Sequence, residues 1–171
     1  DVAEYEELYT KILAAFRTAY PEYKTQTECI LAAHFHLAED CRAAADQLAS
    51  MIKECGVKLQ TGFVGTPYIL HVLSDYGYSE LAYSLLLRKE YPSWLYPVTK
   101  GATTIWEHWD GIMPDGNFWS ADMNSFNHYA YGSVADWIYS VAGGIQRIPE
   151  FPGYEKVKIA PVSYTHLRAH E

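Results

Sequence analysis

The residues best suited to chemistry lie in a short stretch where one carboxylate stands between two tryptophans. Within the segment 101–111, Glu107 directly follows Trp106 and lies close to Trp109. Pyranose rings have C–H faces that pack on aromatic rings, while their hydroxyls and transition-state charge require carboxylates and hydrogen-bonding groups. The stretch therefore favours a carbohydrate site in which Glu107 is catalytic and both indoles bind the sugar.

A second polar cluster follows where a helix is expected to begin. Asn124, Asn127 and His128 supply amide and imidazole groups there. A helix N-terminus that faces the same cleft as the carboxylate would add polar contacts to a sugar. We therefore include Asn127 and His128 among the candidate binding residues.

Other interpretations of these side chains stay open. A glutamate beside two tryptophans is more commonly a surface carboxylate whose aromatic neighbours simply pack. His34 and His36 suggest a metal site, but alternate positions on a helix point to different sides and no third ligand is near. His108, Asp110 and His128 could also hold a metal, although nothing fixes their geometry. We expect no metal and no cofactor.

Composition narrows the class of protein. The 171 residues are 49% hydrophobic, which suffices for one globular domain with a real core. The net charge of −8, without a basic run, argues against nucleic acid or a membrane as partner. Cys29, Cys41 and Cys55 lack metal-binding spacing, and we expect three buried reduced thiols.

The first residues do not resemble a targeting signal. The chain starts at Asp1 without a Met and without a basic-then-apolar leader. A helical pattern begins at once, so we expect a fragment whose true N-terminus and targeting signals lie upstream. Localisation is left open, with the cytoplasm favoured.

Helical periodicity dominates the first half of the chain. Apolar residues recur at three- and four-residue steps, and several segments carry start signals. These signals are a capping box at Thr25 and Glu28, an N-cap at Asp40, and Thr66 followed by Pro67. The predicted helices span residues 2–20, 25–37, 41–55, 67–76 and 79–90.

The periodicity stops at Tyr91 and does not return before about Asn124. Irregular segments of this length are functional or disordered, and the many Trp and Phe side chains argue against disorder. We therefore predict an ordered loop that carries Glu107 and turns at 115–117. A helix from about Ser125 to Ala142 and a strand at 157–159 are expected to follow it.

Three stretches carry a specific resemblance. They are Tyr-Pro-Ser-Trp-Leu-Tyr at 91–96, Lys-Gly-Ala-Thr-Thr-Ile-Trp-Glu at 100–107, and Met-Asn-Ser-Phe-Asn-His-Tyr-Ala-Tyr-Gly-Ser-Val at 123–134. They resemble the bacterial α-L-rhamnosidases, glycoside hydrolase family 78. The resemblance extends to 61–67 and 154–161, and so covers most of residues 25–161.

The resemblance implies an all-α fold, part of an (α/α)6 barrel or six-hairpin toroid, followed by a β-sandwich. Residues 1–148 would form the C-terminal half of the catalytic barrel, and 149–162 would start the sandwich. Residues 163–171 resemble translated adapter or vector sequence, and we expect a non-native tail there. An incomplete barrel would expose apolar helix faces and be poorly soluble.

The resemblance also implies an inverting hydrolase that releases L-rhamnose from rhamnosylated small molecules or oligosaccharides. Glu107 would be the general base on water, and His128 would contact the sugar in the −1 subsite. The family usually has Arg where this chain has His108. The general acid belongs to the upstream half of the same polypeptide, so we expect the isolated chain to need that partner and to be inactive alone.

Two further functions remain as alternatives. One is a noncatalytic sugar-binding module that uses Trp106, Trp109 and His128 as a binding surface. The other is a different helical-toroid enzyme, either another inverting glycosidase or a lyase. Sugar binding without hydrolysis would indicate the module, and a substrate panel would identify the other enzyme.

Overall fold

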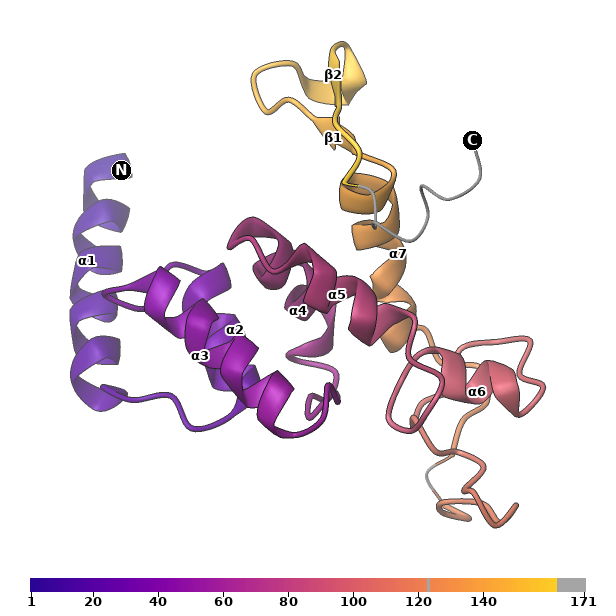
Figure 1. The fold of residues 1–171 in the computed structure, drawn as a ribbon. Coiled ribbons are helices and arrows are strands. Elements are labelled where there is room, and N and C mark those ends of the chain that lie inside the picture. The colour runs from indigo at the N-terminus through magenta and orange to yellow at the C-terminus, as the bar shows by residue number, and fades with distance from the viewer. Residues whose placement is uncertain (123, 163–171) are drawn as a thin grey trace.

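The computed structural model describes residues 1–122 and 124–162. The regular elements of the described residues include seven α-helices and two short strands (Figure 1). The α-helices are α1 (Val2–Ala19), α2 (Gln26–His34), α3 (Cys41–Glu54), α4 (Thr66–Asp75), α5 (Ser79–Leu86), α6 (Leu95–Thr99) and α7 (Val134–Trp137). The remaining elements are 3₁₀ turns at Ala130–Ser133 and Pro152–Tyr154, a π turn at Ile138–Ala142, and the strands β1 (Ile145–Arg147) and β2 (Val157–Ile159).

The core lies among α2, α3, α4 and α5, which gather in one bundle (Figure 1). α2 is apolar nearly all round, and it packs against both α3 and α4. The largest fully buried aliphatic side chains are Ile30, Leu48, Ile52, Ile69, Leu70, Leu73 and Leu85. Each stabilises the fold by about 1.5–3 kcal/mol relative to an exposed side chain. This bundle is the platform from which the loops extend.

The predicted helix starts of α2 and α3 are confirmed. The Thr25 hydroxyl accepts from the Glu28 amide at 3.2 Å, and the Glu28 carboxylate accepts from the Thr25 amide at 2.9 Å. Hydrogen bonds from the amides of Lys24 and Thr25 lower the pKa of Glu28. Asp40 caps α3 by accepting from the Ala43 amide at 2.9 Å. Local sequence therefore fixes where both helices begin.

Several predicted helix boundaries are wrong by a few residues. α2 ends at His34 instead of Leu37, and α5 ends at Leu86 instead of Glu90. Thr66 is the first residue of α4 rather than its cap. Its hydroxyl donates to the Gly62 carbonyl at 2.8 Å and therefore supports the preceding turn.

The predicted helix from 125 to 142 is wrong at its N-terminal end, because helical structure begins only at Ala130. The amides of Ser125 and His128 are hydrogen-bonded to the Glu107 side chain and the Ile105 carbonyl. The carbonyls of Ser125 and Phe126, which in a helix would accept from amides four residues on, accept instead from the Glu107 amide and the Thr104 hydroxyl. The preceding segment also differs from the prediction, because it contains the short helix α6.

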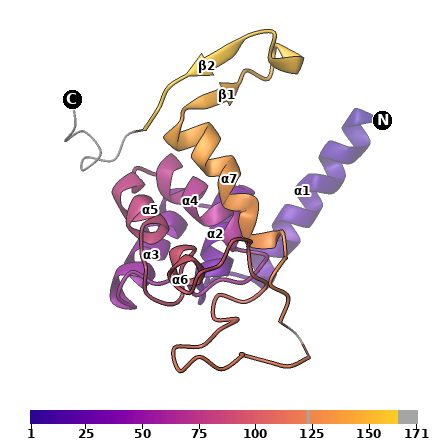
Figure 2. The same cartoon turned by 90° about the vertical axis from the view of Figure 1, so that its right-hand side faces the viewer.

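Helix α1 stands away from the bundle (Figures 1 and 2). None of its residues is buried, and Tyr5, Leu8, Tyr9 and Ile12 are all exposed. The Arg17 guanidinium donates to the carbonyls of Leu37 and Ala38, which precede α3. Among the described residues, none of the helices is both long and apolar enough to cross a membrane.

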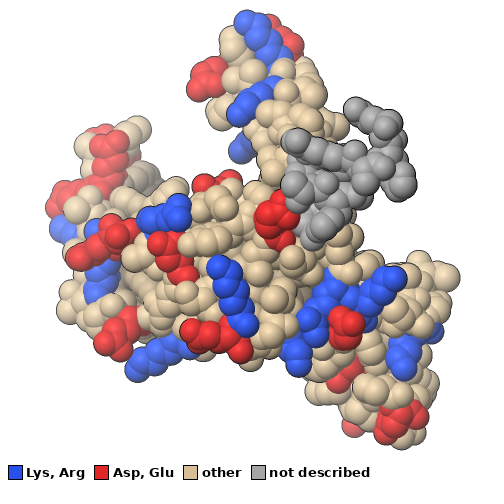
Figure 3. Space-filling model, in the orientation of Figure 1, with Lys and Arg blue, Asp and Glu red and all other residues tan. Residues whose placement is uncertain are grey.

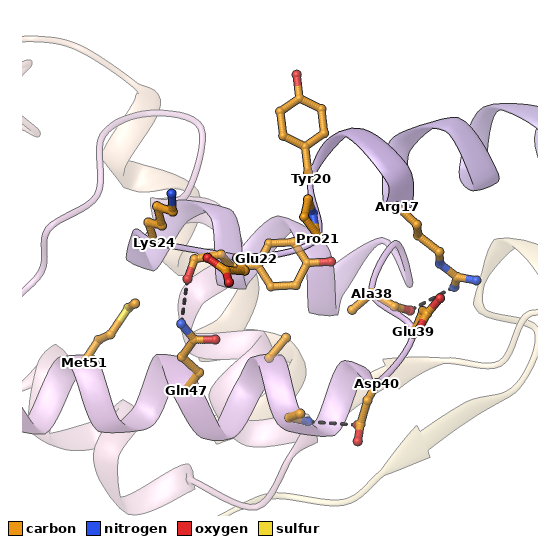
Figure 4. A pocket seen from close by; sticks show the side chains of 13 residues that line it. Arg17, Tyr20, Pro21, Glu22, Lys24, Ala38, Glu39, Asp40, Gln47 and Met51 are labelled. Atoms are coloured by element: carbon orange, nitrogen blue, oxygen red, sulfur yellow. Dashed lines mark hydrogen bonds between the residues drawn. The ribbon is translucent and has the colours of Figure 1, made fainter.

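A cavity of about 740 Å³ lies between the end of α1 and the outer side of α3 (Figure 4). Arg17 bridges it by donating to the carbonyls of Leu37 and Ala38, both at 2.9 Å. Gln47 closes another side by donating to the Tyr23 carbonyl at 2.6 Å. The hydrogen bonds of Arg17 and Gln47 join α1 and the segment after it to the bundle. The cavity therefore lies along the boundary between α1 and the bundle.

The C-terminal part contains the predicted strand β2, which pairs antiparallel with the unpredicted strand β1. Figure 1 shows this hairpin beyond the end of α7. Gly144 permits the return of the chain, because a Cβ there would lie 2.1 Å from the Pro161 nitrogen. β1 precedes the expected domain boundary at 149, and the domain division stays a prediction. The expected non-native tail at 163–171 lies outside the described residues.

Charged side chains of both signs are interspersed on the face shown in Figure 3. Some form ion pairs within one helix, such as Lys11 with Glu7 and Arg42 with Asp46. These exposed pairs contribute little to stability. The expectation that nucleic acid and membranes are not partners stays a prediction.

The three cysteines are free thiols with different surroundings. Cys29 is completely buried in α2, and burial raises the pKa of its thiol to about 11. Cys41 and Cys55 are only partly buried, so the expectation of three buried thiols is correct for Cys29 alone.

We predict that Cys29 resists alkylation in the folded chain. At pH 8 only about one Cys29 thiol in a thousand would be ionised, and reagent cannot reach it without opening of the bundle. Iodoacetamide followed by mass spectrometry should show labelling of Cys41 and Cys55 alone. All three should react in denaturant, and rapid labelling of native Cys29 would contradict the packing.

Candidate active site

The two segments singled out for chemistry are hydrogen-bonded to each other. The Glu107 amide donates to the Ser125 carbonyl at 2.8 Å, and the His128 amide donates to the Ile105 carbonyl at 2.8 Å. The Thr104 hydroxyl donates to the Phe126 carbonyl. Figure 2 shows that this region extends from the helices on the side opposite the β-hairpin. Glu107 and His128 are thus carried by one paired unit.

The Glu107 side chain turns back towards the paired segment. Its Oε2 accepts from the Ser125 amide at 2.9 Å, and the side chain is partly buried. Its Oε1 has no hydrogen-bond partner among the described residues. The carboxylate is therefore held by one oxygen, while the other remains available to a water molecule.

His128 is fixed by stacking and by a hydrogen bond. Its ring lies nearly parallel to Phe63, at 5.0 Å and 9°, and to Tyr129, at 5.2 Å and 8°. Nδ1 accepts from the Ala130 amide at 3.2 Å. In a neutral ring this places the proton on Nε2, which then becomes a donor.

A hollow of about 430 Å³ lies beside His128. Its other lining residues include Phe63, Pro67, Tyr129 and Ser133. Tyr129 is 89% exposed, so a flat apolar surface faces the solvent next to the imidazole. Such a surface suits one face of a sugar or an aglycone.

Trp106 and Trp109 pack inside the chain. They are 5% and 8% exposed. Trp109 stacks on Tyr131 at 3.8 Å and meets Trp94 edge-on at 5.4 Å, whereas Trp106 meets Phe126 edge-on at 5.0 Å. The structure thus gives both indoles a role in holding the loop. Their contact with a sugar stays a prediction, and little of their ring surface is free for it.

Asn127 and His108 lie on the outer parts of the loop. The Asn127 side chain is exposed, while the backbone N–H of Asn127 donates to the Ser125 hydroxyl at 3.2 Å. The His108 ring stacks on Trp119 at 3.7 Å. His108 therefore packs against a neighbouring indole.

The expected turn at 115–117 is confirmed. The Asp115 carboxylate accepts from the Asn117 amide at 3.0 Å, and these hydrogen bonds lower the pKa of Asp115. Gly116 has a φ of 88°, which an L side chain adopts only with strain. This turn closes a small hairpin. The Tyr96 hydroxyl of α6 donates to the Ile112 carbonyl at 2.8 Å and so connects the hairpin to α6.

The histidines considered as metal ligands are engaged in other contacts. Within 1–122 and 124–162, no three His, Cys, Asp or Glu side chains are grouped to hold a metal ion. His34 stacks on Tyr68 at 4.3 Å, while His36 is exposed. His108 and His128 stack on different rings, Trp119 and Phe63.

Comparison with protein families identifies this arrangement. A model of the bacterial alpha-L-rhamnosidase six-hairpin glycosidase domain matches residues 1–142. The chain belongs to this family. Its helices are accordingly part of a six-hairpin domain that lies next to a β region, as the resemblance implied.

Individual rhamnosidases are similar over nearly the whole chain. The α-L-rhamnosidase of Streptomyces avermitilis is 46% identical over 94% of this chain and 16% of its own length. Its crystal structure in complex with L-rhamnose matches with a TM-score of 0.89, covering 95% of this chain and 16% of that chain. The native enzyme of Aspergillus terreus matches at 39% identity with a TM-score of 0.88, covering 94% of this chain and 20% of that chain.

The chain spans only 16 to 18% of the length of the curated rhamnosidases that it matches. The portion matched by the family model, residues 1–142, includes the paired segments around Glu107 and His128. Phe63 also belongs to it, although its residue type gave no reason to select it as a site residue. The sequence feature that could have indicated Phe63 is the turn rich in Gly and Thr just before α4.

We predict that Gly111→Ala destabilises the paired unit. A Cβ at Gly111 would lie 2.8 Å from Asn124 Oδ1 and 3.2 Å from both Phe126 and Trp106. Asn124 cannot easily yield, because its Nδ2 donates to the Gly111 carbonyl at 2.8 Å. Overpacking of this kind costs about 1–3 kcal/mol.

Urea unfolding followed by tryptophan fluorescence measures this change. Gly62→Ala is the matched control, because a Cβ there meets nothing within 4 Å. The control should change the free energy of unfolding by less than about 0.5 kcal/mol. Equal stability of the two variants would show that Gly111 is not closely packed.

Proposed function

We propose that this chain supplies the general base and part of the sugar-binding surface of an enzyme that hydrolyses α-L-rhamnosides with inversion. The observation that carries the proposal is the Glu107 carboxylate, which is anchored through Oε2 and whose Oε1 has no partner in the part of the chain that the structure describes. Family membership and the Streptomyces avermitilis relative support rhamnose as the sugar.

In the proposed reaction, Glu107 Oε1 accepts a hydrogen bond from a water molecule. The water oxygen attacks the anomeric carbon from the face opposite the leaving group, and its proton passes to Glu107. The bond to the leaving oxygen breaks with its electron pair, and a general acid protonates that oxygen. In inverting enzymes the two carboxyl groups are about 6.5–9.5 Å apart, which leaves room for the water.

His128 has a binding role in this proposal. Its Nε2–H would donate to a hydroxyl of the rhamnose in the −1 subsite, since Nδ1 is occupied by the Ala130 amide. The exposed amide of Asn127 lies on the same paired unit and is a further candidate contact. Trp106 and Trp109 would act mainly by keeping this unit in place.

The general acid is proposed to come from the rest of the polypeptide, upstream of this chain. No residue of this chain is assigned to that role. Protonation by a positioned acid typically contributes about 10²–10⁴-fold to the rate. The loops that recognise the aglycone are also expected outside this chain.

We predict that Glu107→Gln abolishes rhamnoside hydrolysis in a complete enzyme. The test is a chimera in which residues 1–162 replace the matching segment of the Streptomyces avermitilis enzyme. A chromogenic α-L-rhamnoside should be cleaved by the chimera, and Glu107→Gln should lower kcat by at least about 10²–10⁴-fold. Proton NMR of the first product should show β-L-rhamnose, as inversion requires.

A matched control is Glu150→Gln, which removes an exposed carboxylate outside the paired unit. It should leave kcat unchanged. Full activity of Glu107→Gln would remove Glu107 from the mechanism. A folded chimera that binds rhamnose without cleaving any α-L-rhamnoside would favour the noncatalytic module instead.

We also predict that the isolated 171-residue chain releases no rhamnose. It would carry a base without an acid, so the leaving group would depart unprotonated. The same chromogenic assay, with the chimera as positive control, measures this. Turnover by the isolated chain that disappears in Glu107→Gln would show that the chain contains its own acid.

A further inference from the structure

Phe63 lies in a tightly bonded turn just before α4. The Thr66 amide and hydroxyl both donate to the Gly62 carbonyl, at 3.0 and 2.8 Å. The buried hydroxyls of Thr61 and Thr66 are 2.9 Å apart. A Cβ at Gly65 would lie 2.7 Å from the Thr27 hydroxyl, so the turn also packs closely on α2. The backbone that carries Phe63 is therefore firmly placed.

The Gln26 side chain anchors the entrance to this turn. Gln26 is 2% exposed, and its Nε2 donates to the Lys58 carbonyl at 3.0 Å. Its Oε1 accepts from the Gln60 amide at 2.9 Å. A buried amide that is satisfied at both ends specifies one chain path, so the turn keeps a fixed position relative to the bundle.

From this turn, the Phe63 ring contacts two aromatic side chains of the candidate site, His128 and Tyr131. It stacks on His128 at 5.0 Å and 9°, and it packs on Tyr131 at 5.1 Å and 54°. Tyr131 in turn stacks on Trp109, two positions after Glu107. A continuous series of rings thus joins the imidazole to the loop of the base.

The stack limits the movements of the His128 ring. Phe63 and Tyr129 are both nearly parallel to the imidazole, and Nδ1 accepts from the Ala130 amide. Offset parallel stacking of aromatic rings is attractive beyond the effect of the area buried. The ring edge with Nε2 is then the part left for a ligand.

We propose that Phe63 is a positioning residue for rhamnoside hydrolysis, acting through His128. Its ring holds the imidazole plane so that the Nε2–H is aimed at the sugar before substrate binds. The inference rests on the proposed function, because it assigns to His128 a contact with the substrate. Phe63 itself does not touch the reacting atoms.

The first test uses Phe63→Leu and Phe63→Tyr in the chimera. Leucine keeps the apolar bulk but removes the flat ring, so kcat/KM for the chromogenic rhamnoside should fall by about tenfold to a hundredfold. Tyrosine should restore activity to within about threefold, because the ring remains. If Phe63→Leu retains the activity of the chimera, the proposal is overturned.

Phe35→Leu is the matched control. Phe35 is 48% exposed against 43% for Phe63, and it also contacts a histidine, His34, at 4.8 Å. It lies outside the paired unit, and that contact is edge-on rather than stacked. The control should leave kcat/KM unchanged. An equal loss in both variants would mean a general effect on folding and would overturn the proposal.

A double-mutant cycle with His128→Ala separates positioning from direct contact. If Phe63 acts through His128, Phe63→Leu should change kcat/KM by less than about twofold once the imidazole is absent. An undiminished effect in the His128→Ala background would overturn the proposal. Glu107→Gln distinguishes failure of the Phe63 proposal from failure of the proposed function. Full activity of Glu107→Gln would contradict the proposed function, whatever the effect of Phe63→Leu.

NMR of the 171-residue chain gives a test that does not depend on activity. Nitrogen-15 spectra of the histidines should show His128 with its proton on Nε2, and its carbon-bound ring protons should be shifted upfield by the adjacent rings. Phe63→Leu should move these signals and leave those of His34 in place. Unchanged His128 signals in that variant would overturn the proposal even if the chimera were inactive.

Discussion

The candidate site depends on the backbone pairing between residues 104–107 and 125–128. The segment between α6 and the 3₁₀ turn at Ala130–Ser133 has little regular structure, so its polar backbone groups need partners from elsewhere. Glu107 exchanges two hydrogen bonds with Ser125, one through its amide and one through its carboxylate. The same contacts that order the loop therefore orient the catalytic candidate, and they bring the His128 segment beside it.

Aromatic packing connects this unit to the helical bundle. Trp94 donates to the Tyr131 carbonyl at 2.9 Å, and Trp109 stacks on the Tyr131 ring. Burial raises the pKa of Tyr131 to about 12, so its hydroxyl remains neutral at ordinary pH. Further along, Trp137 of α7 donates to Ser74 of α4 at 2.9 Å. The indole-rich composition thus serves first to support a loop that contains few regular elements.

The features that sequence predicted well are those set by local interactions. The Thr25 capping box, the Asp40 cap and the 115–117 turn each depend on residues close in the chain. Sequence failed where distant segments compete for the same groups. The carbonyls of Ser125 and Phe126 accept from the Glu107 amide and the Thr104 hydroxyl instead of from amides four residues on, so the expected helix starts late. Periodicity says nothing about which rings a long loop buries around itself, so the burial of Trp106 and Trp109 was not predicted, and their contact with a sugar stays a prediction.

The most direct test of the account is a crystal structure of the chimera with L-rhamnose bound. The account predicts one rhamnose at the paired unit, with His128 Nε2 donating to a hydroxyl. Glu107 should lie within about 2.6–3.2 Å of a water positioned to attack the anomeric carbon. Rhamnose bound without contact to His128, or a Glu107 carboxylate directed away from the sugar, would contradict the central claim that this pairing builds the catalytic base and its binding partner.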